Sequence, residues 1–76
     1  MAGQERRAPD IVRLVVNGEA KEVRGRTLAA LLDEFGYGGQ KVATALNGEF
    51  VAEKLRTATA LTPGDQIEIV APRQGG

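Results

Sequence analysis

The residues best suited to chemistry are the last five, Pro72-Arg73-Gln74-Gly75-Gly76, which follow an apolar run and are expected to end in a free carboxylate. Gly75 and Gly76 have no side chains, so the walls of a partner's slot can close on both faces of the backbone. A carboxylate at the end of such a thin tail could be activated inside another protein. Terminal residues are also often small and frayed, so the tail alone leaves both an activated carboxylate and an idle end open.

Length and charge restrict the classes of function. The 76 residues fit one small domain, with 10 basic and 10 acidic residues and a formal net charge of zero. The balance argues against a nucleic-acid or membrane surface, which would show a basic excess. No apolar run approaches the roughly 18 residues of a membrane-spanning helix, and Arg6 and Arg7 are not followed by the apolar core of a signal peptide. We therefore expect a cytoplasmic protein.

The residue types that are absent argue against an ordinary active site. The chain has no Cys and no His, so it lacks a thiolate nucleophile and the commonest general base and metal ligand. One Tyr, two Phe and no Trp do not provide an aromatic platform for single-stranded nucleic acid. We expect no metal site and no enzyme. If the protein takes part in chemistry, it does so as a carrier or substrate.

Two Asn-Gly pairs organise the sequence into hairpins. Asn17-Gly18 and Asn47-Gly48 each supply the two residues with positive φ that a type I′ turn requires. Residues 1–10 are interpreted as a disordered arm. The strands are predicted at residues 11–16, 20–24, 42–46, 50–51 and 66–70. Residues 52–60 are predicted to be an irregular crossing segment with room for a short turn. Pro63-Gly64 indicates a turn before the last strand.

One amphipathic helix is predicted after Thr27, a good N-cap. Its apolar residues recur at the spacing of a single helical face, and Gly36 ends it. Together with the alternating strand residues, this stripe predicts a core. Its members are Val12, Leu14, Leu28, Leu31, Leu32, Leu46, Leu61, Ile67 and Ile69.

These elements predict an α+β fold of the β-grasp type, with a mixed sheet of four to five strands and one main helix packed on one face. A single helix covers one face, and the two most apolar strands, the first and the last, are expected side by side at the centre. Residues 11–71 would form this domain, and residues 72–76 would leave from the middle of the sheet as a flexible tail.

The chain resembles the ThiS family, the sulfur carriers of thiamine synthesis, from about residue 11 to residue 76. The resemblance rests on the order and spacing of five blocks: residues 15–19, 27–32, 42–49, 64–70 and 74–76. Residues 52–60 depart from the pattern, because they lack the Pro-Arg pair and the aromatic residue of many members. The resemblance implies the ubiquitin-like β-grasp fold, in agreement with the elements above.

The resemblance also implies a function for Gly76. A ThiF-like adenylating enzyme would use ATP to make an acyl-adenylate at Gly76, with Gly75 and Gln74 in the tail. A sulfur donor, ultimately a cysteine desulfurase, would convert the adenylate to a thiocarboxylate. Thiazole synthase would then take the sulfur into the thiazole ring.

Three other functions stay open on the sequence. The chain could be a molybdopterin-synthase small subunit or another sulfur carrier, a ubiquitin-like protein modifier, or a β-grasp interaction domain with an idle tail. For the carrier, we expect Val15, Ala45 and Val70 to lie on the sheet face away from the helix. Apolar patches often mark interaction sites, so we expect the adenylating enzyme to dock there.

Overall fold

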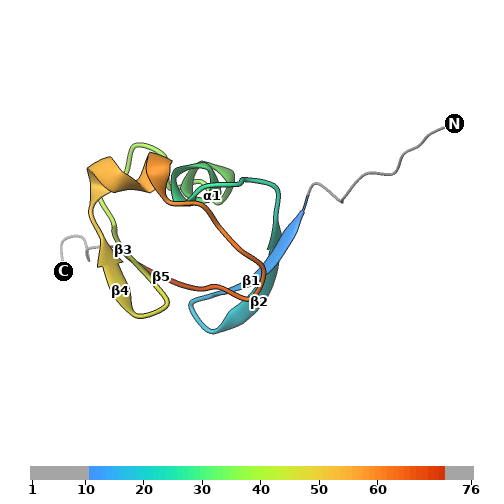
Figure 1. Ribbon diagram of the computed structural model, residues 1–76. Helices are drawn as coiled ribbons and strands as arrows, with labels where there is room; N and C mark the ends of the chain where they lie inside the picture. The colour runs from blue at the N-terminus through green and yellow to red at the C-terminus, as the bar shows by residue number, and fades with distance from the viewer. Residues whose placement is uncertain (1–10, 72–76) are drawn as a thin grey trace, which may run out of the picture.

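The computed structural model of the chain describes residues 11–71, so the predicted arm at residues 1–10 and the tail at residues 72–76 lie outside it. In chain order the elements are β1 (Val12–Val16), β2 (Glu19–Val23), α1 (Leu28–Glu34), β3 (Ala43–Leu46), β4 (Glu49–Val51), the 3₁₀ helix η2 (Glu53–Ala58) and β5 (Gln66–Val70). The two helices lie on one side of a curved sheet (Figure 1). This arrangement confirms the expected α+β β-grasp fold.

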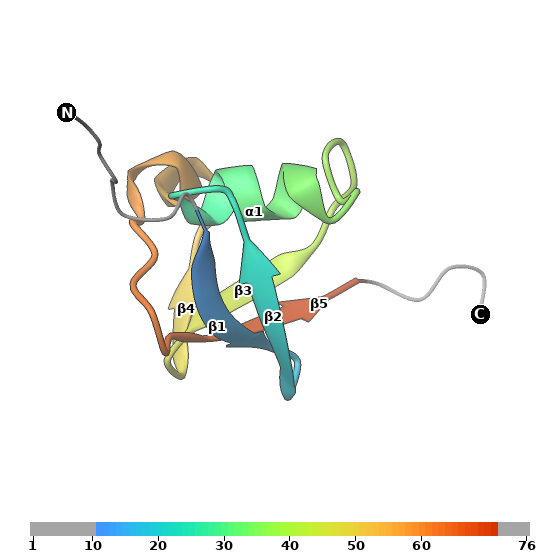
Figure 2. The same cartoon turned by 90° about the vertical axis from the view of Figure 1, so that its right-hand side faces the viewer.

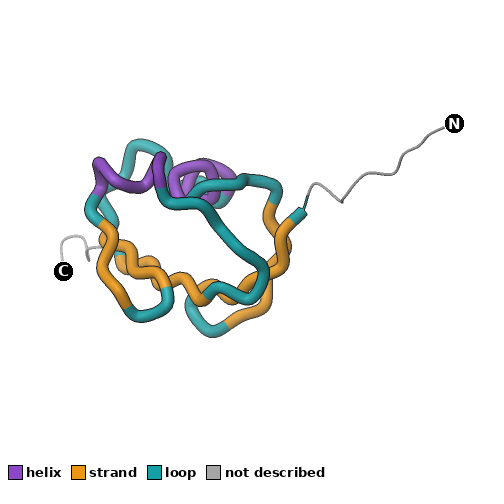
Figure 3. Tube along the Cα trace, in the orientation of Figure 1, coloured by secondary structure: helices purple, strands orange, loops and turns teal. Residues whose placement is uncertain are grey.

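The strands form one mixed sheet in the order β2-β1-β5-β3-β4. β1 pairs with β5 in parallel, whereas the β1–β2, β3–β4 and β3–β5 pairs are antiparallel. Figure 2 shows α1 crossing above the strands, and the tube in Figure 3 separates the helices from the strands as two layers. The first and last strands are neighbours near the sheet centre, as the sequence predicts, and β5 is the middle strand.

Both Asn-Gly pairs form the predicted tight turns. Asn17 and Asn47 each have a φ of 51°, and Gly18 and Gly48 follow with φ of 83° and 87°. An Asn side chain tolerates this left-handed backbone better than most residues do, and Gly tolerates it without a penalty. The two turns therefore set the register of the hairpins on either side of β5.

The helix begins and ends where the sequence places its caps. The Thr27 hydroxyl accepts a hydrogen bond from the Ala30 amide at 3.2 Å, and Gly36 has a φ of 85° just beyond the last turn. Leu28, Leu31 and Leu32 are buried against the sheet, so the apolar stripe of the helix faces the core.

Eight of the nine predicted core residues are buried, and Leu46 is half-buried against the edge of the core. The core also contains Val16, Val23 and Val51, from the same inward faces of their strands. Two polar residues are buried with them, Thr44 and Arg56. Neither was expected from the apolar pattern.

Residues 52–60 are more regular than predicted. Six of them form the 3₁₀ helix η2, which packs beside α1. The expectation of an irregular crossing segment was therefore wrong over Glu53–Ala58. The physical reason is the burial of Arg56 in this segment, which anchors the helix to β3 through hydrogen bonds rather than through an apolar stripe.

Candidate functional site

The candidate site begins where β5 ends. Gln74, Gly75 and Gly76, the predicted sulfur-carrying tail, lie outside the described residues. The described chain leads up to them through Val70, which is paired with Ala43 of β3, and Ala71, which is exposed. The tail therefore follows directly from the central strand of the sheet.

Two asparagine side chains hold β5 at its two ends. Asn17 Oδ1 accepts a hydrogen bond from the Ile69 amide at 2.8 Å, and its Nδ2 donates to the Ile69 carbonyl at 3.2 Å. Asn47 Oδ1 accepts from the Gln66 amide at 2.9 Å, and its Nδ2 donates to Asp65 Oδ1 at 3.0 Å. The strand that precedes the tail is thus fixed by side chains as well as by its neighbouring strands.

The three residues predicted to form a docking patch all lie on the sheet face away from α1. On each strand their inward neighbours are buried, which turns Val15, Ala45 and Val70 outward. Val15 and Ala45 are half-buried, and Val70 is 63% exposed. They do not form one continuous patch, because Ala45 lies opposite Glu68, and Val15 lies opposite Gln66 at the far end of β5 from Val70.

An exposed aromatic residue extends this face at the β4 edge. Phe50 is 72% exposed and lies opposite Ala45 in the antiparallel β3–β4 pair. Ala43, opposite Val70, is also exposed. We call Ala43, Ala45, Phe50 and Val70 the outer-face patch. Sequence reasoning missed Phe50, although its position next to the inward Val51 in a short strand is a sufficient signal.

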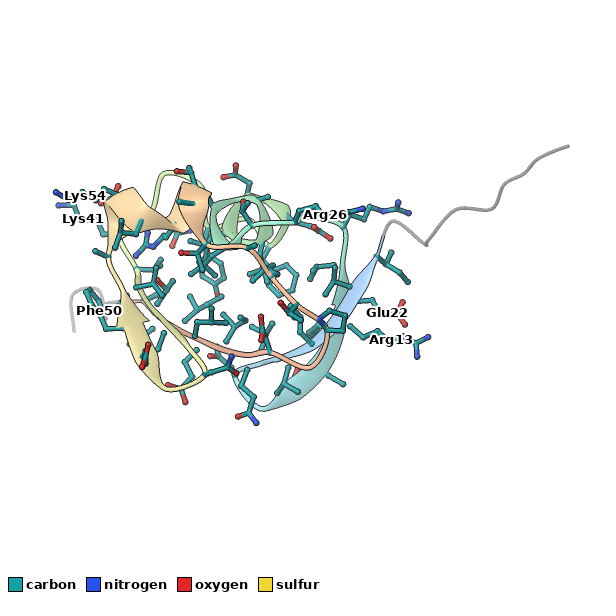
Figure 4. All side chains as sticks on the ribbon, in the orientation of Figure 1. Arg13, Glu22, Arg26, Lys41, Phe50 and Lys54 are labelled. Atoms are coloured by element: carbon teal, nitrogen blue, oxygen red, sulfur yellow. The ribbon has the colours of Figure 1, made fainter. Side chains whose placement is uncertain are left out.

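The two ends of the sheet carry different exposed side chains. Arg13 and Glu22 form an ion pair at 3.0 Å across β1 and β2, both largely exposed. Phe50 lies at the opposite end of the molecule, as do Lys41 and Lys54 (Figure 4). An exposed ion pair adds little to stability, so the main difference is that the β3–β4 end adds an exposed aromatic side chain.

A hollow of about 670 Å³ adjoins the patch between the end of α1, residues 37–43 and η2. Arg56 lines it and is only 8% exposed. Its Nε donates to Thr44 Oγ1 at 3.0 Å and its Nη2 donates to the Val42 carbonyl at 2.6 Å. These bonds join η2 to β3. These structural hydrogen bonds explain the burial of Arg56 without a ligand.

Residues 11–71 contain no helix long and apolar enough to cross a membrane. In the same part of the chain, no three or more acidic, His or Cys side chains come together in a group that could hold a metal ion.

Comparison with known proteins identifies the family. The family model described as the ThiS family matches residues 12–76. A curated sulfur carrier protein ThiS from Thermus thermophilus is 38% identical over 61 residues, which cover 80% of this chain and 95% of that protein. A curated thiazole synthase from Paramagnetospirillum magneticum is 39% identical over 66 residues, 86% of this chain. The chain spans only 20% of that synthase.

A solved structure agrees with the sequence matches. The crystal structure of the thiamine biosynthesis protein ThiS from Geobacter metallireducens superposes with a TM-score of 0.71 and 29% identity, over 86% of this chain and 100% of that one. The family match extends from the start of β1 through the final Gly-Gly. The chain therefore belongs to the ThiS family.

Proposed function

We propose that this protein is a sulfur carrier of thiamine biosynthesis and that Gly76 carries the sulfur as a thiocarboxylate. The observation that carries the proposal is the family match, which runs to residue 76 and so includes Gln74, Gly75 and Gly76. The Thermus thermophilus sulfur carrier, matched over nearly its whole length, supports the same function.

The chemistry follows from the weakness of a carboxylate as an electrophile. The Gly76 carboxylate attacks the α-phosphorus of ATP, and pyrophosphate leaves. The resulting acyl-adenylate has AMP as a good leaving group. The terminal sulfur of a donor persulfide displaces AMP and gives an acyl disulfide. A thiol reductant then attacks the donor's sulfur in the S–S bond, which leaves the thiocarboxylate on Gly76 and a disulfide between the donor and the reductant. Because the chain has no Cys, it has no thiol of its own that could hold the sulfur.

In this proposal the partner enzymes supply every catalytic group. A ThiF-like enzyme performs the adenylation, a cysteine desulfurase provides the sulfur, and thiazole synthase consumes the thiocarboxylate. The similarity of this chain to a segment of a thiazole synthase supports a carrier that works beside such an enzyme. The chain itself is then a co-substrate, not an enzyme, and the proposal keeps the cytoplasmic location expected from its sequence.

For docking of the adenylating enzyme we propose the outer-face patch, which includes Val70 and Ala45 as predicted and Phe50 in addition. Val15, at the far end of β5 from Val70, lies outside it. Val70 and Phe50 expose most of their apolar surface on the same face. Burying such side chains in a partner is the commonest source of binding energy at an interface. The patch also lies at the base of the tail, so a docked enzyme would have the tail within reach.

A charge scan tests the docking face. Val70→Asp should weaken binding of the ThiF-like enzyme by at least about tenfold, because a carboxylate would be desolvated in the interface. Ala20→Asp adds the same charge on the same face, but on β2, opposite Val15. It should bind like the unsubstituted protein. Equal affinity of the two folded variants, measured by calorimetry, would contradict the docking proposal.

Adenylation tests the function itself. With a ThiF-like enzyme and ATP, the protein should support exchange of pyrophosphate into ATP. Gly75→Val should slow this exchange greatly, because its β-branched side chain is too bulky for a slot that fits glycine. The melting temperature should not change. Conjugation to lysines in a cell extract would instead favour a protein modifier, and consumption of the thiocarboxylate by a pterin-forming enzyme would favour the molybdopterin pathway.

A further inference from the structure

The parallel pairing between β1 and β5 stops before β5 does. The Val15 amide donates to the Asp65 carbonyl at 2.9 Å, and the Asn17 amide donates to the Ile67 carbonyl at 2.9 Å. Continued in the same register, the ladder would next bind the amide and the carbonyl of Ile69. The backbone of β1 cannot do this, because it turns away at Asn17 and Gly18.

The side chain of Asn17 takes the place of the missing strand. Its Oδ1 accepts from the Ile69 amide at 2.8 Å, where the next backbone carbonyl of β1 would be. Its Nδ2 donates to the Ile69 carbonyl at 3.2 Å, where the next backbone amide would be. One side-chain amide thus binds both polar groups of a residue 52 positions away in the sequence.

Asn47 provides an internal comparison. It has the same φ of 51° in the same kind of Asn-Gly turn, and its side chain also binds β5. Its contacts are with Gln66, the first residue of β5, and with Asp65 just before it. Asn17 therefore holds the end of β5 that leads to the tail, and Asn47 holds the opposite end.

We propose that Asn17 is a positioning residue for the chemistry at Gly76: by binding Ile69 it holds in place the end of β5 from which the chain continues to the tail. This inference rests on the proposed function. Gly76 lies seven positions after Ile69, and a segment of that length spans at most about 25 Å. If Ile69 is released from Asn17, the free segment lengthens and Gly76 has more positions to search. Holding a reacting atom close to its partner is a large part of catalysis, so this loss slows the reaction.

Two glycine variants test the proposal. Glycine adopts the positive φ of both turns, so Asn17→Gly and Asn47→Gly remove the side-chain hydrogen bonds and keep the turns. In the unsubstituted chain, Ile69 and Gln66 should both be protected from amide exchange. We expect Asn17→Gly to expose the Ile69 amide, and Asn47→Gly to expose the Gln66 amide.

The kinetic difference between the variants is the decisive result. We expect the kcat for adenylation to fall about tenfold in Asn17→Gly relative to Asn47→Gly, with little change in KM, because docking is intact and only the reacting end is misplaced. The assay runs at a temperature at which both variants are folded. If Asn17→Gly unfolds there, Asn17→Asp replaces it. The aspartate keeps the acceptor for the Ile69 amide and loses the donor to the Ile69 carbonyl, so a smaller fall in kcat in the same direction is expected.

The two possible failures are distinct. An unsubstituted protein that forms no adenylate with its ThiF-like enzyme contradicts the proposed function. An unsubstituted protein that reacts, while the Asn17 variant reacts as fast as Asn47→Gly, contradicts only the positioning role. The positioning role is also contradicted if kcat falls in both variants in proportion to the decrease in their melting temperatures.

Discussion

The hydrogen bond between Thr44 and Arg56 can be tested with a double-mutant cycle. Thr44 Oγ1 donates to the Val51 carbonyl at 2.9 Å and accepts from Arg56 Nε at 3.0 Å, and both side chains are buried. Within residues 11–71 the structure shows no carboxylate paired with Arg56. In the described part of the chain the guanidinium is held by two neutral oxygens, so loss of one of them should lower the free energy of unfolding substantially.

The expected magnitudes follow from the groups that each change leaves unpaired. Thr44→Val removes the hydroxyl that binds both the Val51 carbonyl and the Arg56 guanidinium. The free energy of unfolding should fall by about 2–5 kcal/mol in total. Arg56→Met keeps most of the side-chain volume and removes the buried charge. It leaves the Val42 carbonyl without its donor and should cost about 1–3 kcal/mol. In the double variant no guanidinium remains to lose its acceptor, so its cost should fall short of the sum by about 1–2 kcal/mol.

Urea denaturation of the four proteins measures this coupling, because urea adds no ions that would screen the guanidinium. All four proteins should unfold in one transition with similar slopes, so that differences in midpoint report stability. If the two changes add within about 0.5 kcal/mol, the Thr44–Arg56 hydrogen bond contributes nothing specific. In that case the account of η2 as a segment anchored to β3 through Arg56 is wrong.

Two further predictions concern the packing of α1. Leu31 is 0% exposed, so Leu31→Ala should lower the free energy of unfolding by about 2–5 kcal/mol, and an unchanged thermal melt would show that the helix stripe does not face the sheet. Gly25 lies against the first turn of the helix, where a Cβ would come within 2.7 Å of Ala30 Cβ and 2.9 Å of the Ala30 carbonyl carbon. Gly25→Ala should therefore destabilise the protein by about 1–3 kcal/mol; a variant as stable as the unsubstituted protein would refute this close approach.

Local signals predicted most of the fold. The spacing of Leu28, Leu31 and Leu32 was sufficient for the helix and its buried face, since an amphipathic period specifies both. The two Asn-Gly pairs were sufficient for both hairpins, because few residues accept the backbone that a type I′ turn requires. Alternation along β5 predicted which of its side chains point inward.

The interactions that sequence reasoning missed all depend on polar side chains that bind distant partners. Nothing around Arg56 in the sequence distinguishes it from an exposed arginine. Its burial depends on Thr44 of β3 and on Val42 just before that strand. The contact of Asn17 with Ile69 likewise joins residues 52 positions apart. The Asn-Gly turn already gave a local reason for Asn17, so nothing in the sequence indicated that its side chain also binds Ile69. Phe50 is different: it was missed although its alternation with Val51 indicates an outward aromatic residue.

The most direct test of the central claim is the intact mass of the protein after reaction with a ThiF-like enzyme, ATP and a sulfur source. The mass should rise by the difference between a sulfur and an oxygen atom, and tandem fragmentation should locate that change on Gly76. Deletion of Gly76 should abolish the change and leave the melting temperature unaltered. A protein that gains sulfur equally well without Gly76, or that gains none with its own organism's adenylating enzyme, would contradict the proposal that Gly76 carries the sulfur.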